Sequence, residues 1–179
     1  MIEENYLKMK NEYIDSIKRW ITEEGEVSPH ITIFACLRDN PEDIALIHVP
    51  VQGEFMSTEK SKEEFVTNII PKIAIEVKKK FIPKGVAWTS EVWIRNFNKG
   101  EKVPNNWKSK PIDEEALVIN IEFESDKELL VYNIIRNGKQ VNEEGEIKDH
   151  VEIIKKELGD WETMTGRFTD LYKKIVADS

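Results

Sequence analysis

Two strand-like stretches separated by a short turn constrain the fold of this chain most strongly. HITIFACL at 30–37 and IALIHVPV at 44–51 are rich in β-branched and apolar residues, and RDNPED lies between them. An Asn-Pro pair interrupts both strands and helices, so RDNPED predicts the six-residue loop of a β-hairpin. Pro50 has no amide donor, which predicts that the second strand is an edge strand or ends there.

A second hairpin is predicted further along the chain. ALVINIEFES and KELLVYNIIR meet at Ser125-Asp126, and Asn137-Gly138 then predicts a tight turn, leaving room for a short strand at Lys139–Asn142. Strand alternation sorts the first of these segments into two faces. Leu117, Ile119, Ile121 and Phe123 point one way, and Asn120, Glu122 and Glu124 point the other way. That strand is therefore expected to be covered on one side only.

Two helices are predicted before the middle of the chain. Residues 1–24 carry one apolar stripe at helical spacing, made of Ile2, Tyr6, Met9, Tyr13, Ile17 and Trp20. STEKSKEEFVTNIIPKIAIEVKKKF predicts a second helix with a capping box from Ser61 to Glu64. Pro71 should kink or break this helix, and Pro83 with Gly85 should end it.

The C-terminal part is expected to be helical over 148–176. DHVEIIKKELG opens this segment, and a final apolar stripe follows, interrupted by Gly166 and made of Trp161, Met164, Phe168, Leu171, Tyr172 and Ile175. The resulting order, α-ββ-α-βββ-α, predicts an α+β fold with a mainly antiparallel sheet of about five strands and helices packed mostly on one face. We expect a single domain over 1–179 with its sheet core at 29–142.

Composition narrows the class of protein. The chain has 179 residues, 34% of them charged, and no apolar run long enough to span a membrane. Its N-terminus has no apolar signal segment, and the lone Cys36 excludes an internal disulfide, which together predict a cytoplasmic protein. Cys36 lies in a strand pattern, where a buried structural thiol is expected.

Charge is unevenly distributed along the chain. The formal net charge of −8 argues against a general nucleic-acid partner. From Lys78 to Lys110 there are nine basic residues against two acidic ones, whereas Pro111–Ser179 holds nine against seventeen. The basic part includes FNKGEKVPNNWKSKPIDEE, which has no periodic pattern and is long enough to suggest a functional loop. Trp107 lies in this loop, where it could stack on a base, anchor a protein partner or fold back onto its own domain.

The stretch GVAWTSEVWIRN at 85–96 reads as a strand with two different faces. Val86, Trp88, Ser90, Val92 and Ile94 form the more apolar face, which is the expected core side, whereas Ala87, Thr89, Glu91, Trp93 and Arg95 form the mixed face. Ser90 and Glu91 point to opposite sides and so cannot form a nucleophile–base pair without a bulge. Each charge on the mixed face is expected to meet a charge on a neighbouring strand.

Sequence motifs for common chemistries are absent. The chain has no phosphate loop, dinucleotide fingerprint, nucleophile elbow or zinc-protease helix. His30 and His48 fall on strands that we expect to pair and could approach each other, but no other ligand stands at metal spacing beside them. His48 is expected to be partly buried and hydrogen-bonded. We expect neither a metal nor a cofactor.

GVAWTSEVWIRN, PIDEEALVINIEFES and RNGKQV together resemble a loose group of small bacterial and phage proteins. That group has a strand reading roughly Val-Ala-x-x-Ser-Glu-x-Trp, a variable Pro-containing loop and an acidic segment leading into an Ala-Leu-Val strand. The resemblance covers about Ile31–Val141. It implies an α+β domain of phage or mobile-element origin, and it transfers no activity and no catalytic residue.

Three functional hypotheses remain open. The first is a non-enzymatic protein-binding domain, acting as a homodimer through an exposed sheet face or edge, or through another protein partner. The second is a binder or enzyme for an anionic small molecule or nucleotide, and the third is an acidic nucleic-acid mimic. The candidate residues for a partner or an anionic ligand are Glu91, Trp93, Arg95, Lys99, Lys102, Trp107 and Lys108, with Glu91 as the acid/base if there is catalysis.

Overall fold

The computed structural model describes residues 2–98, 100–124, 126–158, 168 and 170–177. Within them, six strands form one antiparallel sheet in the order β2-β1-β3-β4-β5-β6. The strands are β1 (His30–Leu37), β2 (Ile44–Pro50), β3 (Phe81–Ile94), β4 (Glu114–Phe123), β5 (Lys127–Val141) and β6 (Ile147–Lys155). The predicted α+β class and antiparallel sheet are confirmed, with one strand more than expected.

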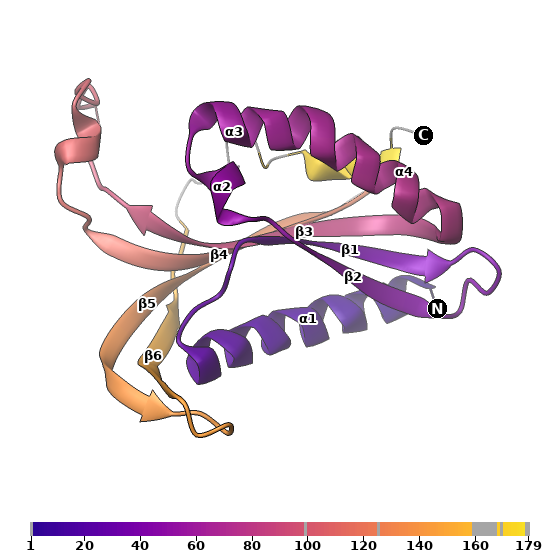
Figure 1. Ribbon diagram of the computed structural model, residues 1–179, viewed down its shortest axis with the longest axis horizontal. Helices are drawn as coiled ribbons and strands as arrows, with labels where there is room; N and C mark the ends of the chain where they lie inside the picture. The colour runs from indigo at the N-terminus through magenta and orange to yellow at the C-terminus, as the bar shows by residue number, and fades with distance from the viewer. Residues whose placement is uncertain (1, 99, 125, 159–167, 169, 178–179) are drawn as a thin grey trace.

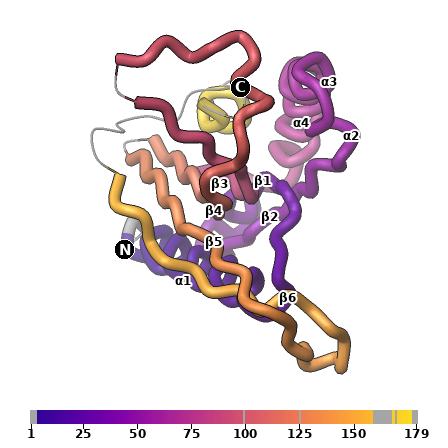
Figure 2. Tube along the Cα trace, turned by 90° about the vertical axis from the view of Figure 1, so that its left-hand side faces the viewer, coloured from indigo at the N-terminus to yellow at the C-terminus, as the bar shows by residue number. Residues whose placement is uncertain are grey.

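Helices cover both faces of the sheet (Figure 1). The helical elements of the described residues are α1 (Ile2–Glu24), α2 (Gly53–Met56), α3 (Glu59–Glu64), the π-helical turn η1 (Phe65–Ile69), α4 (Ile70–Lys80), the 3-10 turn η2 (Trp107–Ser109) and the π-helical turn η3 (Lys173–Ala177). Figure 2 shows α1 on one side of the strands and the α3–α4 layer on the other. The prediction of helices mostly on one face is wrong. In these described ranges, no helix is both long and apolar enough to cross a membrane.

Two of the three apolar clusters among the described residues follow from this layering, and the third is a smaller one around Ala116, Val118 and Val131. Of the first two, one lies between α1 and the sheet, and the other lies between the sheet and the α4–η3 layer. β3 contributes to both, because Ala87 packs in the first core whereas Val86 and Trp88 pack in the second. The predicted alternation is thus correct, but Ala87 and Thr89 on the mixed face are also buried, whereas Trp93 is exposed. Ser90 and Glu91 lie on opposite sides, since the β3–β4 register runs without a shift.

α1 buries most of the predicted stripe. Tyr13 and Ile17 are almost fully buried, whereas Trp20 is 44% exposed, so the placement of Trp20 in the core is wrong. The helix ends at Glu24, as predicted, and the amide of Gly25 donates to the Ile21 carbonyl at 2.9 Å. Gly25 has a φ of 80°, a left-handed conformation that glycine adopts without strain.

The first hairpin has the predicted form. β1 ends at Leu37 and β2 begins at Ile44, so RDNPED is the whole loop. β2 is an edge strand of the sheet and ends at Pro50. Cys36 is buried in β1, as expected of a structural thiol.

The second helix differs from its prediction at both ends. Its capping box joins Thr58 to Ser61, three residues upstream of the predicted Ser61–Glu64 box. Pro71 breaks the helix as expected, since the π-helical turn η1 precedes it and Pro71 stands in the first turn of α4. The helix stops at Lys80, before Pro83 and Gly85, which both belong to β3.

The C-terminal region departs most from expectation. Ile147–Lys155 is the edge strand β6 and not the start of a helix. Asn137-Gly138 is not a turn between strands, because β5 runs through it with a register shift after Arg136. The reversal comes at Asn142–Glu146, where Gly145 has a φ of 82°. Phe168, Leu171 and Ile175 of the predicted stripe are buried, whereas Trp161, Met164 and Gly166 lie outside the described residues.

β4 is covered on both faces, which corrects a further prediction. Asn120 and Glu122 were expected to face solvent, yet they are only 8% and 2% exposed. The Glu122 carboxylate accepts from the amide of Tyr172 at 2.8 Å and from Nδ2 of Asn120 at 3.0 Å. The C-terminal helical turn therefore covers the polar face of β4.

Candidate functional site

Residues 95–113 form an arm that projects from the body of the protein between β3 and β4 (Figure 1). At its base, the amide of Asp113 donates to the Ile94 carbonyl at 2.9 Å, and the amide of Asn96 donates to Oδ2 of Asp113 at 2.6 Å. Nε of Arg95 donates to the Lys110 carbonyl at 2.7 Å. These bonds tie the two sides of the arm together where it leaves the sheet.

Cationic side chains surround the arm's aromatic rings. The guanidinium carbon of Arg95 lies 5.9 Å from the centre of the Trp107 ring, and Nζ of Lys108 lies 5.5 Å from it. Nζ of Lys110 lies 4.7 Å from the Phe97 ring centre. Such contacts contribute about 0.5–1 kcal/mol each at exposed sites. The structure thus brings the candidate residues Arg95, Trp107 and Lys108 together.

Apolar surface is exposed along the same arm and beside it. Trp107 is 40% exposed, Val103 51%, Ile112 41%, and Trp93 on the adjoining end of β3 67%. The sequence of 95–113 has five basic residues against Glu101 and Asp113. Lys102 and Lys108 are exposed, and Lys99 lies outside the described residues. The arm thus combines exposed aromatic and aliphatic side chains with an excess of positive charge.

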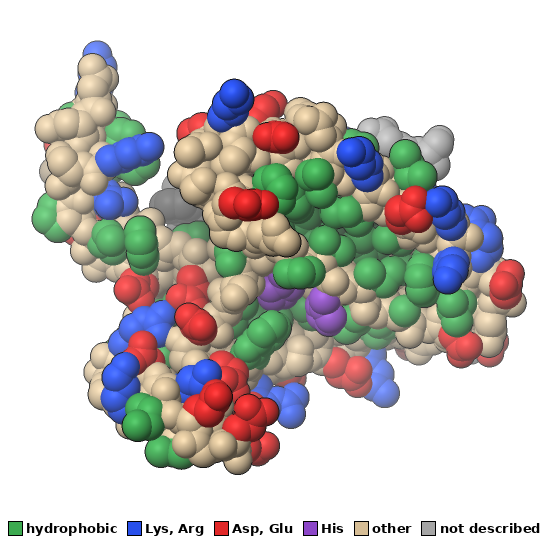
Figure 3. Space-filling model, in the orientation of Figure 1, with side chains coloured by type: hydrophobic (Ala, Val, Ile, Leu, Met, Phe, Trp, Pro, Cys, Tyr) green, Lys and Arg blue, Asp and Glu red, His purple; other side chains and the backbone are tan. Residues whose placement is uncertain are grey.

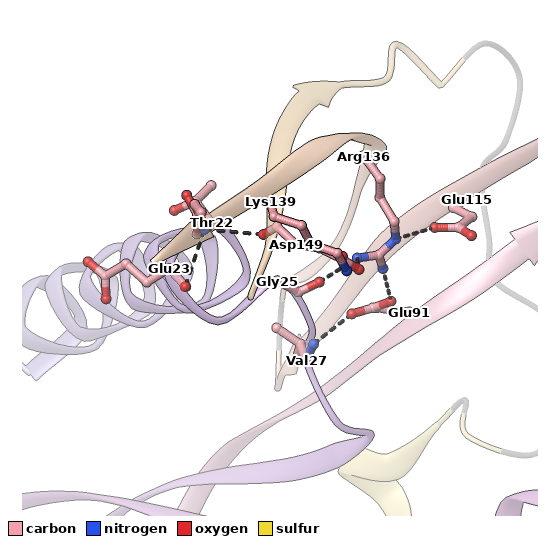
Figure 4. Close-up of polar contacts among 10 residues, drawn as sticks. Thr22, Glu23, Gly25, Val27, Glu91, Glu115, Arg136, Lys139 and Asp149 are labelled. Atoms are coloured by element: carbon pink, nitrogen blue, oxygen red, sulfur yellow. Dashed lines mark hydrogen bonds and ion pairs between the residues drawn. The ribbon is translucent and has the colours of Figure 1, made fainter. Parts of the chain in front are cut away.

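Glu91 belongs to a different cluster, which is centred on Arg136 (Figure 4). Its Oε2 accepts from Nη2 of Arg136 at 2.8 Å, and its Oε1 accepts from the amide of Val27 at 2.6 Å. Arg136 also donates through Nε to Glu115 at 2.8 Å and through Nη1 to the Gly25 carbonyl. The structure therefore separates Glu91 from the cations of the arm and joins it to Arg136.

Burial raises the pKa of Glu91, while the Val27 amide and the Arg136 guanidinium lower it. A carboxylate held by two donors is a structural acceptor, and its position gives no support to an acid/base role. Glu91 was expected to meet a charge on a neighbouring strand, but its cationic partner Arg136 belongs to β5, which β4 separates from β3. Sequence reasoning missed Arg136 itself, because its partners lie 45 and 21 residues away in the chain.

A second polar cluster lies between α1 and the sheet. The Tyr13 hydroxyl lies 2.6 Å from Oγ1 of Thr89 and 3.2 Å from Nε2 of His30. Oγ1 of Thr32 lies 2.8 Å from Nδ1 of His48, and the two histidine rings are 6.0 Å apart. The predicted approach of the histidines is thus seen. His48 is hydrogen-bonded as expected, and its side chain is more exposed than expected.

Metal chemistry receives no support from the geometry. Among the described residues, no group of three or more His, Cys, Asp or Glu side chains could hold a metal ion. Burial lowers the pKa of His30 and of His48, which favours their neutral forms. The cluster is a hydrogen-bonded contact between α1 and the strands, with Trp20 stacked on His30 at 5.8 Å between ring centres.

No protein-family model, curated protein or solved structure matches the chain.

Proposed function

We propose that the protein is a non-enzymatic binding protein that contacts an acidic protein partner through the arm at 95–113. The observation that carries this proposal is the grouping of Arg95 and Lys108 around the exposed Trp107 on a projecting segment. Tryptophan and arginine are enriched among the residues that dominate binding energy at protein interfaces. The excess of lysine and arginine selects a partner surface of opposite charge.

The shape of the arm favours a protein partner over a small anion. Small-molecule sites bury most of their ligand in a concave pocket, whereas the arm stands out from the body (Figure 1). A hollow beside α3 contains no arm residue, and its lining has more acidic than basic side chains: Glu59, Lys60, Glu63, Glu64, Thr67 and Asn68. An anionic nucleotide or sugar phosphate therefore finds less support than a protein surface.

Nucleic-acid mimicry by the acidic C-terminal part also finds less support. Several of its carboxylates are paired within the chain: Asp149 with Lys139, Glu146 with Lys148, and Glu114 with Lys156. Pairing of this kind reduces the continuous negative field that such mimicry requires.

The test begins with a photo-crosslinking amino acid at position 103, an exposed residue of the arm that leaves Trp107 in place, in extract of the source organism. A captured protein is then purified, and its affinity is measured against the wild type, Trp107→Ala and Lys108→Glu. We expect Trp107→Ala to weaken binding by about 2 kcal/mol, roughly thirtyfold. Lys108→Glu should also weaken it, and added salt should weaken the wild-type complex.

Lys72→Glu is the matched control, because Lys72 is an exposed lysine on α4, away from the arm. It makes the same charge change and should leave the affinity of the captured protein unaltered. Equal binding by the wild type, Trp107→Ala and Lys108→Glu would overturn the proposal. So would a thermal shift by a nucleotide or sugar phosphate that Arg95→Ala abolishes, because that result identifies the arm as a small-anion site.

A further inference from the structure

β2 leaves one row of backbone hydrogen-bonding groups without a neighbouring strand. The amide of Leu37 donates to Asp43 and the amide of Val51 donates to Pro29, so the odd-numbered residues of β2 bond to β1. The even-numbered residues consequently direct their amides and carbonyls toward the open edge. Pro50 is one of these, so its missing amide removes nothing from the pairing with β1.

β2 also lacks the features that usually protect an edge strand. Its sequence, IALIHVP, has no Lys, Arg, Asp or Glu, and its pairing with β1 has no bulge. The opposite edge strand β6 carries Lys148, Asp149, Glu152 and Lys155. Charged side chains and bulges are the usual means by which proteins block pairing at an edge. Of the two sheet edges, only the β6 edge is blocked by charge.

The side chains of β2 favour contact with another apolar strand. Leu46 packs toward the α1 core, and Ile47 and Val49 pack toward the α4 core, each only partly buried. In Figure 3, histidine side chains lie among hydrophobic ones on the side of the molecule where Figure 1 shows β2. A strand added at this edge would extend both cores outward.

We propose that two copies of this chain pair antiparallel through β2 and form one continuous sheet. A twofold axis relates the two strands of an antiparallel pair of identical segments, so both copies present the same outward groups of Ile44, Leu46 and His48. A pairing strand must be uncharged along the shared edge, because a charge held against these apolar side chains would lose its solvation. β2 of a second copy meets this condition. The pairing closes the unblocked edge and leaves the charged β6 strands outermost.

This interface is independent of the arm. The dimer depends on backbone hydrogen bonds and apolar contacts of β2, whereas the proposed partner contact depends on the charge of residues 95–113. Rising salt should therefore weaken arm binding and leave the dimer intact, because screening acts on exposed charges. Failure of either proposal would leave the other standing.

Sedimentation velocity over a wide range of protein concentration tests the pairing. The wild type should form a dimer, and His48→Lys, which places a fixed charge at the edge, should raise its dissociation constant at least about tenfold. Ile154→Lys makes a matched change at an exposed residue of β6 and should leave the dimer unchanged. Trp107→Ala should leave it unchanged as well.

Leu46→Pro adds a test of the backbone, because it removes an outward amide while the ladder with β1 does not use that group. If Leu46→Pro fails to fold, the effect of His48→Lys on the dissociation constant of the dimer tests the pairing by itself. A wild type that is monomeric at every concentration would overturn the proposal. A dimer that His48→Lys leaves intact, or that Ile154→Lys or Trp107→Ala disrupts, would also overturn it by placing the interface elsewhere.

Discussion

Arg136 bridges two carboxylates that belong to different strands, with Nη2 lying 2.8 Å from Oε2 of Glu91 and Nε 2.8 Å from Oε2 of Glu115. Nη1 adds the Gly25 carbonyl and lies 3.5 Å from Oδ2 of Asp149. One side chain thus joins β3, β4 and β6 to the segment that leads from α1 into β1. The cluster holds the end of α1 on the sheet.

Removal of Arg136 should strongly destabilise the protein. Arg136→Ala leaves the carboxylates of Glu91 and Glu115 without their cation, whereas Asp149 keeps its ion pair with Lys139. Removing one partner of a buried ion pair costs about 3–5 kcal/mol in the free energy of unfolding. This cluster is partly exposed, so the expected loss is about 3 kcal/mol, at the lower end of that range. Urea unfolding at neutral pH measures it.

The pH dependence of that loss separates electrostatics from packing. Burial already raises the pKa of Glu91, and without Arg136 the pKa rises further. A carboxyl whose pKa is raised in the folded state lowers the free energy of unfolding when it is ionised. The difference in that free energy between Arg136→Ala and the wild type should therefore shrink as the pH falls toward 4.5, the ordinary pKa of a glutamate. Arg136→Lys keeps the positive charge but lacks the several N–H donors of the guanidinium group. It should lose less unfolding free energy than Arg136→Ala. A loss that stays constant from neutral to acidic pH would point to packing alone.

The contact between Tyr13 and His30 should make the protein acid-sensitive. Nδ1 of His30 lies 2.8 Å from the Ser28 carbonyl, which can only accept, so Nδ1 carries the proton and Nε2 accepts from Tyr13. Burial is the main cause that lowers the pKa of His30, and burial also lowers the pKa of His48. The folded state therefore favours neutral histidines.

Stability should hold above about pH 6.5 and fall as the pH drops from there through the lowered pKa values, because the unfolded chain binds protons first. The slope reaches at most about 1.4 kcal/mol per pH unit for each histidine. Urea unfolding across this range measures the slope, and His30→Gln should flatten it. Proton NMR in which His30 titrates at or above 6.5 would contradict the prediction.

Gly85 should tolerate no side chain, because of Phe123 on the neighbouring strand. A β-carbon at Gly85 would overlap the Phe123 ring and lie 3.0 Å from its Cζ. Forcing extra atoms into a packed core costs about 1–3 kcal/mol, so Gly85→Ala should lower the midpoint of thermal unfolding. In a double-mutant cycle, Phe123→Leu should recover part of the loss. Strict additivity of the two substitutions would show that the overlap is not its cause.

Local patterns predicted those elements whose signals lie within a few residues. Asn40-Pro41 and the β-branched residues around it specified the first hairpin and its loop, and Pro71 marked the break before α4. β6 was misread because Val151, Ile153 and Ile154 in a charged segment suit a helix as well as a strand. Pairing with β5, which no local pattern encodes, decided for the strand.

The site was predictable in part for the same reason. Arg95, Trp107 and Lys108 lie within one loop, so their grouping was visible in the sequence. The partners of Glu91 and Tyr13 come from distant elements, and the sequence gives no sign of either contact. Alternation correctly sorted the faces of β3 and β4, but it could not show that helices from both ends of the chain cover both faces.

Glu122 should hold the C-terminal helical turn on the sheet. Its carboxylate is 2% exposed, and its partners are the Tyr172 amide and Nδ2 of Asn120. Glu122→Ala leaves both buried donors without this acceptor, which should cost about 2–3 kcal/mol in the free energy of unfolding. Glu122→Gln keeps an acceptor oxygen and should lose less.

Hydrogen exchange at the Tyr172 amide is the decisive measurement for this contact. In Glu122→Ala the amide should exchange faster than in the wild type, whereas amides of β1 and β3 should change only by the global loss of stability. Glu124→Ala, a change at an exposed residue just beyond the end of β4, is the control and should leave the Tyr172 amide protected. Equal exchange of that amide in the wild type and in Glu122→Ala would show that the carboxylate does not anchor the turn, and the 2.8 Å contact would then carry no stabilising role.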